Sequence, residues 1–267
     1  MNVISLSALD LSFAAALVLL VALMSLLMRL GLFKRIIIAA LRTTIQLTLI
    51  GLVLKVLFAN AELPWVALLA LLMLSIAGYE VMARQHRRFS GWWGYGLGTL
   101  SMFISSFAIT VFALLVVIGT EPWYTPQYAI PLLGMMLGNT MTGVALSLDH
   151  LTQTTHAQRA VIENRLMLGE EWRVAMTDVV RNSVRVGLIP MLNAMAAAGV
   201  VSLPGVMTGQ ILSGTPPVEA VKYQILIMFL IGAGTGFSTM GATWLAARRL
   251  FDERQRLRLE RLVAGRR

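Results

Sequence analysis

Long apolar segments recur along this chain and constrain its fold more than any other feature. A helix needs about 20 mostly apolar residues to cross the hydrocarbon core of a bilayer. The expected spans are residues 8–28, 36–58, 65–83, 94–118, 127–148, 184–212 and 221–247. They leave no room for a large soluble domain. The sequence therefore predicts an all-α, polytopic membrane helix bundle of about seven transmembrane helices, with residues 1–267 as a single transmembrane domain.

Composition supports a membrane protein. Hydrophobic residues make up 57% of the chain and charged residues 13%, whereas a typical soluble domain has about 25% charged residues. The chain has no cysteine, which excludes disulfides and thiolate metal sites.

The basic residues predict the topology. Apart from Arg42, Lys55 and Lys222, every Lys and Arg falls into one of four clusters. The clusters lie at 29–35, 84–88, 159–185 and 248–267, and the connections between them carry Glu62, Glu121 and Glu219. Because basic loops stay on the cytoplasmic side, we expect the N-terminus outside and the C-terminus inside. The net charge of +9 is then a sign of topology, and nucleic-acid binding is not expected.

The sixth expected span is the least regular, because it contains Gly199, Pro204, Gly205 and Gly209. An unbroken helix is not expected there. Non-helical backbone at membrane depth is tolerated only where it is buried in protein or lines a cavity. Either the break marks a translocation path that includes Gln210, or the span ends near Leu203 and an outer re-entrant turn follows.

Residues 149–183 form the longest polar stretch between spans and are expected to fold as two amphipathic helices joined at Gly169. Val161, Leu168 and Trp172 share one face if a helix continues through Gly169. A helix on a lipid surface would be rich in Lys and Arg, but here basic and acidic residues nearly balance. The stretch therefore reads as a cytoplasmic protein-docking surface. The tail at 248–267, in contrast, is expected to be a solvated or lipid-contacting basic helix.

Part of this polar stretch, "ENRLMLGEEW", is similar to the coupling-helix loop of ABC transporter permeases, with Glu163 and Gly169 at the matching spacing. The resemblance implies that a separate ATPase subunit docks on this loop. The residues expected to make the contact are Glu163, Leu166, Gly169, Glu171 and Trp172.

Three longer segments resemble the FetB-type permeases. They are "LRTTIQLTLIGLVLK" (41–55), "IPLLGMMLGNTM" (130–141) and "SLPGVMTGQILSGTPPVEAVKYQI" (202–225). That family is regarded as the membrane half of an ABC exporter connected with iron efflux. The resemblance implies a homodimeric permease of the bacterial inner membrane that exports iron, another metal or a metal complex. It also implies no cofactor on this chain, with ATP held by the partner subunit.

The lysines agree with a separate ATPase. A phosphate-binding P-loop needs Gly-Lys followed by Ser or Thr. None of Lys34, Lys55 and Lys222 follows a glycine.

The fifth expected span contains an unusual stretch, "PLLGMMLGNTMTGVALS" (131–147). Gly134 and Gly138 are spaced to let another helix approach closely. Asn139 either makes a hydrogen bond between helices or borders the cargo path. The expected path residues of this span are Met135, Met136, Asn139 and Thr142.

Arg42 and Gln46 lie one turn apart in the second span and are further path candidates. Arg42 either snorkels to the headgroups or pairs with Glu80 in the third span, and an ionisable residue inside the membrane is a functional candidate by default. The metal ligands stay unassigned. Thioethers favour Cu(I) over Fe(II), and the three histidines, His86, His150 and His156, lie in cytoplasmic loops.

Rival functions are a secondary transporter or channel without an ATPase, an ABC permease for a non-metal cargo, and a membrane-embedded enzyme. No span carries a histidine–carboxylate metal cluster or a nucleophile–base pair. A transport role without catalysis on this chain is therefore the prediction.

Overall fold

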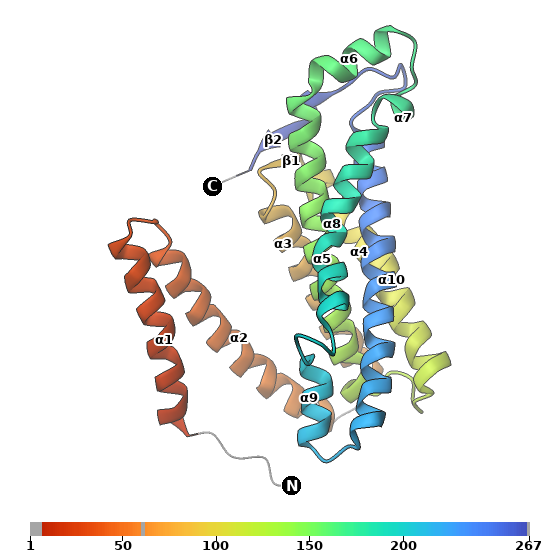
Figure 1. The fold of residues 1–267 in the computed structure, drawn as a ribbon. Helices are drawn as coiled ribbons and strands as arrows, with labels where there is room; N and C mark the ends of the chain where they lie inside the picture. Colours follow the sequence, from red (N-terminus) through yellow and green to blue (C-terminus); the bar gives the residue numbers. More distant parts are fainter. Residues whose placement is uncertain (1–6, 60–61, 266–267) are drawn as a thin grey trace.

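The computed structural model describes residues 7–59 and 62–265, and long helices dominate it (Figure 1). The α-helices are α1 (Ala8–Leu27), α2 (Phe33–Ala59), α3 (Leu63–Ala83), α4 (Trp92–Phe112), α5 (Pro126–Ala157), α6 (Arg159–Met167), α7 (Trp172–Ala175), α8 (Thr177–Ala197), α9 (Gly205–Leu212) and α10 (Pro217–Arg249). A π-helix, η1 (Ala113–Ile118), extends α4, and a short 3₁₀ helix, η2 (Leu259–Arg261), precedes β2 (Leu262–Ala264), which pairs with β1 (Arg87–Phe89). The prediction of an all-α polytopic membrane bundle is confirmed.

Six helices in the described ranges are long and apolar enough to cross a membrane: α1, α2, α3, α4 with η1, α5 and α10. They correspond to six of the seven expected spans. The remaining span is divided between α8 and α9. Asp178, Arg181 and Arg185 make the first half of α8 too polar to count by composition. The total of seven spans therefore stays a prediction.

The expected break in the sixth span is confirmed. Helix α8 ends at Ala197, and Gly199 follows with φ +80°. The carbonyl oxygen of Ala197 accepts hydrogen bonds from the backbone N–H groups of Val201 (3.0 Å) and Ser202 (3.1 Å), which closes a turn. Pro204 then precedes α9, so residues 205–212 are helical again.

The helices alternate in direction, so the connections fall at two ends of the molecule (Figure 1). The end drawn at the top holds β1, α6, α7 and β2, and the α1–α2 turn, drawn lower and to the left, is the upper end of its hairpin; the described parts of the four basic clusters lie in or beside these segments. The opposite end holds α9 and the starts of α3 and α10, where Glu62 and Glu219 lie. This grouping of charge is what the predicted topology requires, and the side of the membrane that each end faces stays a prediction.

Helix α5 is the centre of the bundle and packs against α3, α4, α8 and α10. Its contact with α8 and α10 is made by small residues. A Cβ added to Gly187 of α8 would lie 2.6 Å from the carbonyl oxygen of Gly143, and one added to Gly143 would lie 2.8 Å from Thr235 Cγ2 of α10. Such small residues let helix backbones approach closely where lipid supplies no hydrophobic drive for packing.

The close approach expected at Gly134 and Gly138 is wrong for the described chain. A Cβ at Gly138 would meet no atom within 4 Å, and one at Gly134 would meet only the flexible end of Met73, at 3.2 Å. These two glycines face α2, which leans away from the bundle (Figure 1), so no helix backbone reaches them.

Helices α1 and α2 form a hairpin, here called the arm, that packs loosely on the rest of the molecule (Figure 1). In α2 only Leu57 is buried, near the end of the helix that joins α3. Leu57 shares a cluster with Val66 and Leu69 of α3. The arm is therefore anchored at that end, and most of its apolar side chains are exposed.

The predicted basic helix at 248–267 is wrong beyond Arg249. Residues 250–265, here called the strap, fold back over the basic end, and β2 pairs antiparallel with β1. Asp252 closes the turn by accepting hydrogen bonds from the backbone N–H groups of Arg254 (3.0 Å) and Arg256 (2.8 Å). Since Leu257 and Leu262 also pack on the core cluster, side-chain contacts outweigh the helical tendency of the arginine-rich sequence.

Candidate functional site

The unusual stretch of α5 presents different residues to different neighbours. Met136, Thr140 and Ser147 are fully buried toward α4 and α10. The Thr140 hydroxyl lies 3.2 Å from that of Ser106 on α4, and Ser147 bonds to Thr243 on α10. The stripe of Gly134 and Gly138 faces the arm, and the stripe of Met135 and Asn139 faces α8, α9 and α10.

The Met135–Asn139 stripe lines a small cavity at the break between α8 and α9. Its volume is about 190 Å³. We call it the methionine cavity, because its walls include the four thioethers of Met135, Met191, Met195 and Met228. Asn139 and Gln224 are its polar side chains, and Pro204 and Gly205 bring the broken segment to its edge. The irregular backbone thus lines a cavity, which is where such backbone is tolerated.

Asn139 does not join two helices in the described structure. Its Nδ2 donates to the carbonyl oxygen of Met135, one turn earlier in α5, at 2.8 Å. This leaves the side-chain oxygen without a protein donor among the described residues. The amide is therefore held in place by its own helix, at the wall of the cavity.

The cavity includes only part of the predicted path in this region. Met136 is not in the cavity wall; it is fully buried and packs against Gly234 of α10. Thr142 donates to the carbonyl oxygen of Gly138 at 3.1 Å and lies outside the cavity wall. Gln210 lies more than a turn further along α9, where its side-chain oxygen is buried without a partner in the described residues.

Sequence reasoning missed Met191, Met195 and Met228. The sulfurs of Met191 and Met195 are close to Gly232 of α10: a Cβ there would lie 3.6 Å from Met195 Sδ and 3.7 Å from Met191 Sδ. The signal in the sequence was the four-residue spacing of Met191 and Met195, which places them on one helix face. It was hidden by the many methionines elsewhere in the chain.

A second cavity, here called the charged cavity, lies between the arm, α3 and α5. Its volume is about 470 Å³. Arg42, Gln46, Glu80 and Arg84 are in its walls, with Gly134 and Gly138 opposite. The pairing of Arg42 with Glu80 is confirmed, because Arg42 Nη2 donates to Glu80 Oε1. Arg84 Nε lies 3.8 Å from the other oxygen of Glu80.

The predicted coupling loop is a projecting helix–turn–helix at the basic end. Helix α6 ends at Met167, and Gly169 adopts φ +92°, so the predicted joint at Gly169 is confirmed. Arg165 holds the turn by donating to Glu170 Oε2 at 2.7 Å. Met167 and Leu168 are 77% and 85% exposed at its tip. We call residues 166–171 the coupling turn.

The other predicted coupling residues lie around this turn. Glu163 is half-buried and accepts from Arg159 Nε at 2.8 Å, and Glu171 is exposed. Trp172 faces inward, because its ring stacks on Phe251 of the strap at 5.6 Å and its backbone N–H donates to Gln255 at 2.9 Å. The helix does not continue through Gly169, so Val161, Leu168 and Trp172 do not share a face.

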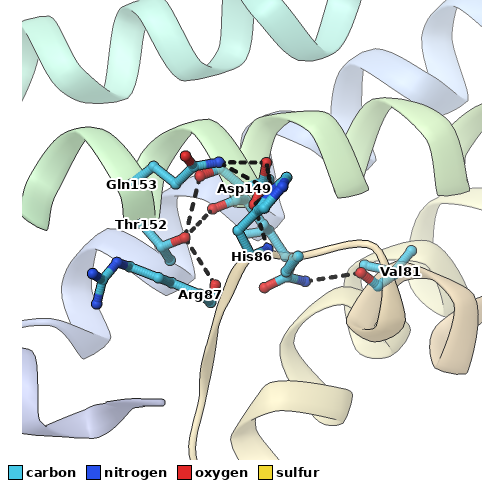
Figure 2. Close-up of polar contacts among 8 residues, drawn as sticks. Val81, His86, Arg87, Asp149, Thr152 and Gln153 are labelled. Atoms are coloured by element: carbon cyan, nitrogen blue, oxygen red, sulfur yellow. Dashed lines mark hydrogen bonds and ion pairs between the residues drawn. The ribbon is translucent and has the colours of Figure 1, made fainter. Parts of the chain in front are cut away.

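A polar network joins the loop after α3 to α5 below the coupling turn (Figure 2). The backbone N–H of His86 donates to Asp149 Oδ1 at 2.7 Å, and His86 Nδ1 lies 3.1 Å from Asp149 Oδ2. Gln153 Nε2 donates to the same carboxylate at 2.7 Å, and Thr152 donates to the carbonyl oxygen of Arg87 at 2.9 Å. This network fixes β1, and through it the strap, to the end of α5.

Within residues 7–59 and 62–265, no group of three or more His, Asp or Glu side chains is placed to hold a metal ion. His150 pairs with the hydroxyl of Ser183 at 3.0 Å and does not join His86. The methionine cavity offers amide and thioether groups, and the charged cavity offers the carboxylate of Glu80 and the amide of Gln46.

Comparison with known proteins places most of the chain in one family. Residues 8–251 match the model described as "Uncharacterised protein family (UPF0014)". A UPF0014 membrane protein of Synechocystis is 40% identical over 81% of this chain and 83% of its own length. No solved structure matches the chain.

Two other relatives carry more informative names. "Probable iron export permease protein FetB" of Escherichia coli is 33% identical over 81% of each chain. "Protein ALUMINUM SENSITIVE 3" of Arabidopsis thaliana is 35% identical over 87% of this chain and 83% of its own length. The resemblance to FetB-type permeases is thus confirmed over most of the sequence.

Proposed function

Because the chain belongs to the UPF0014 family of membrane proteins, we propose that it is the permease subunit of an ABC exporter, driven by a separate ATPase. The observation that carries the proposal is the coupling turn. It projects from the basic end, presents Met167 and Leu168, and is surrounded by balanced charge. An exposed apolar tip with a charged rim is suited to a groove on a soluble partner.

The connection of the coupling turn to the helices suggests how ATP would drive transport. Helix α6 follows α5 with only Gln158 between them, and α7 leads into α8 after Met176. Both α5 and α8 line the methionine cavity. Movement of the turn by the ATPases would therefore be passed to two walls of that cavity and change which end is open.

The proposed cargo is a metal, as an ion or a complex, with iron as the first candidate. The E. coli relative is named as a probable iron export permease, and the Arabidopsis relative is named for aluminium sensitivity. The methionine cavity offers weak ligands to iron, since thioethers prefer softer ions. Weak ligands suit a cargo that must be released, and a chelated ion would need contacts with its chelator instead.

The proposal extends to assembly and orientation. Residues 1–267 act as one permease domain of the bacterial inner membrane, with the N-terminus outside and the C-terminus inside. Two copies pair and carry one ATPase on each coupling turn. The basic residues gathered at the coupling end support this orientation, since basic loops stay in the cytoplasm.

The experiment that tests the coupling role is a search of the neighbouring genes for a P-loop ATPase, followed by a pull-down of that ATPase with the permease. Leu168→Asp should abolish recovery of the ATPase while the permease still inserts in the membrane. The matched control is Val218→Asp, because Val218 is 68% exposed at the start of α10, at the opposite end of the bundle. Recovery of the ATPase with both variants would overturn the assignment, and would favour a channel or secondary transporter.

Cargo is tested on the purified complex. Ferrous iron should stimulate ATP turnover more than aluminium or copper, and the stimulation should vanish when Leu168→Asp uncouples the subunits. Equal turnover with and without each metal would contradict a metal cargo.

A further inference from the structure

Three arginines line a cavity between α4, α10 and the strap at the basic end of the bundle. The cavity has a volume of about 320 Å³. Its walls are Trp93, Leu97, Leu245, Arg248, Arg249, Phe251 and Arg261. We propose that this arginine cavity binds the phosphate headgroup of an anionic phospholipid. The proposal does not depend on the exporter role.

The first argument is unbalanced charge. No carboxylate is in the cavity wall, and two acids of the strap, Asp252 and Glu260, are already paired. Asp252 lies 2.9 Å from Arg256 and 3.0 Å from Arg258, and Glu260 lies 3.2 Å from Arg258. Within the described part of the chain, Arg248, Arg249 and Arg261 have no carboxylate partner. A bound anion would offset the repulsion among them.

The second argument is geometry. The guanidinium of Arg249 stacks on the ring of Trp93 at 4.3 Å. Arg261 is held in place because its Nη1 donates to the carbonyl oxygens of Arg249 (2.6 Å) and Phe251 (3.2 Å). A guanidinium that stacks on a ring keeps its in-plane N–H groups free, and their fork matches two oxygens of a phosphate. The cavity therefore presents donors that are already oriented.

The third argument is depth, which favours a lipid over a soluble phosphate compound. Trp92 and Trp93 begin α4 and are exposed, and Trp244 is exposed one turn before Arg248. Tryptophans of this kind lie at the level of the headgroups. Leu97 and Leu245 form the apolar part of the wall, where a lipid would place its glycerol and acyl chains. Basic pockets at the cytoplasmic ends of membrane helices bind acidic headgroups in this way.

The experiment compares lipid binding by the purified full chain using native mass spectrometry. Phosphatidylglycerol should bind more tightly than phosphatidylcholine, and Arg248→Gln with Arg249→Gln should weaken its binding on the order of tenfold, given about 1 kcal/mol per basic residue at the surface. The matched control is Arg181→Gln with Arg185→Gln, which removes the same charge from exposed positions of α8. If the first double variant does not fold, Arg248→Gln alone serves, because Arg248 is exposed and makes no side-chain hydrogen bond within the described residues.

The outcomes distinguish a lipid site from general charge attraction and from a site for soluble phosphate. Selective loss in the cavity variant, with the control unchanged, supports the lipid site. Equal loss in both double variants would mean general attraction to positive charge and would overturn it. Displacement of the lipid by millimolar inorganic phosphate would assign the cavity to a soluble phosphate compound and would overturn the lipid assignment. Unchanged lipid binding in the cavity variant would also overturn it.

Discussion

The arm and the helices α5, α8 and α10 show that apolar composition and burial are separate properties in this protein. In the most apolar stretch of α2 none of the residues is buried, and in the most apolar stretch of α1 11% of the residues are buried. The corresponding values are 56% for α5 and 50% for α10, although both of these helices contain more polar residues. The two helices of the arm are therefore less packed than α5 and α10, although their mean hydropathy is higher.

The physical reason is the solvent. In lipid, an apolar side chain gains little by leaving its surroundings, so helices associate through close packing of small residues and through hydrogen bonds between helices. Gly143, Gly187 and Thr239 supply that packing between α5, α8 and α10. The arm is rich in Leu, Ile and Val and has no comparable small-residue seam against the bundle. Its exposed surface is available to lipid or to a second copy of the chain.

The largest expected effect is on thiol labelling, which tests whether the arm spans the membrane with its turn on the same side as the strap. The chain has no native cysteine, so single cysteines report cleanly. Leu30→Cys in the arm turn and Glu253→Cys in the strap should react with an impermeant thiol reagent only after the cells are permeabilised. Ser213→Cys, between α9 and α10, should react in intact cells. Labelling of Leu30→Cys in intact cells would show that the arm does not share the core's topology.

The next effect compares a leucine placed in each region. Gly187→Leu should lower the Tm by about 10 °C, since overpacking against the backbone of Gly143 costs about 3 kcal/mol. Gly51→Leu in α2 should change it little, because a Cβ there meets no atom within 4 Å. Thermal melts of the two purified variants measure the difference. Similar Tm values for both would mean that the core packing is looser than the structure has it.

A smaller effect, on metal export, tests whether the methionine cavity or the charged cavity carries the cargo. Asn139→Ala should keep the ATPase on pull-down yet lower metal export about tenfold, the effect of losing one polar contact of about 1.4 kcal/mol. Little stability is lost, because Asn139 bonds only to its own helix in the described structure. Gln46→Ala in the charged cavity should lower export less. The reverse order would place the path beside the arm.

Removing the ion pair that links the arm to the core should have a modest effect on stability. Glu80→Gln removes the partner of Arg42 and should lower the Tm by a few degrees, because an ion pair with an exposed partner contributes about 1 kcal/mol or less. It should also raise the rate at which Gln46→Cys reacts with a water-soluble thiol reagent, as the arm moves more freely. An unchanged rate would show that contacts near Leu57 alone hold the arm.

The smallest effect concerns pH and the strap. The pKa of Asp252 is lowered to about 2, chiefly because its carboxylate accepts the backbone N–H of Arg256. A pKa lower in the folded state means that the contribution to stability is present above the ordinary pKa of about 4 and is lost as pH falls toward 2. The protection factors of the strap amides, which compare each exchange rate with the intrinsic rate at the same pH, should therefore be steady from pH 8 to pH 5. Asp252→Asn should lower those protection factors across this whole range, and unaltered protection factors would contradict the role of this turn.

The sequence by itself determined the features that depend on composition and local pattern. Apolar length determined the spans, loop charge determined which ends group together, and glycine with proline determined the break after Ala197. The joint at Gly169 was also predictable. The backbone after α6 turns with φ +92° at this position, and a residue without a Cβ adopts such an angle most easily. The pair of Arg42 with Glu80 was one of two alternatives that the sequence left open, the other being snorkelling to the headgroups, and the structure decided for the pair.

Only the tertiary structure decided which faces meet. Met135 and Met136 are neighbours in sequence but point in different directions from α5, since successive helix positions are about 100° apart. The methionine cavity, the inward stacking of Trp172 on Phe251, and the folding of the strap onto β1 all join residues far apart in the chain. Such contacts depend on how helices cross and on where a tail finds backbone partners, and no periodicity in a single segment encodes either.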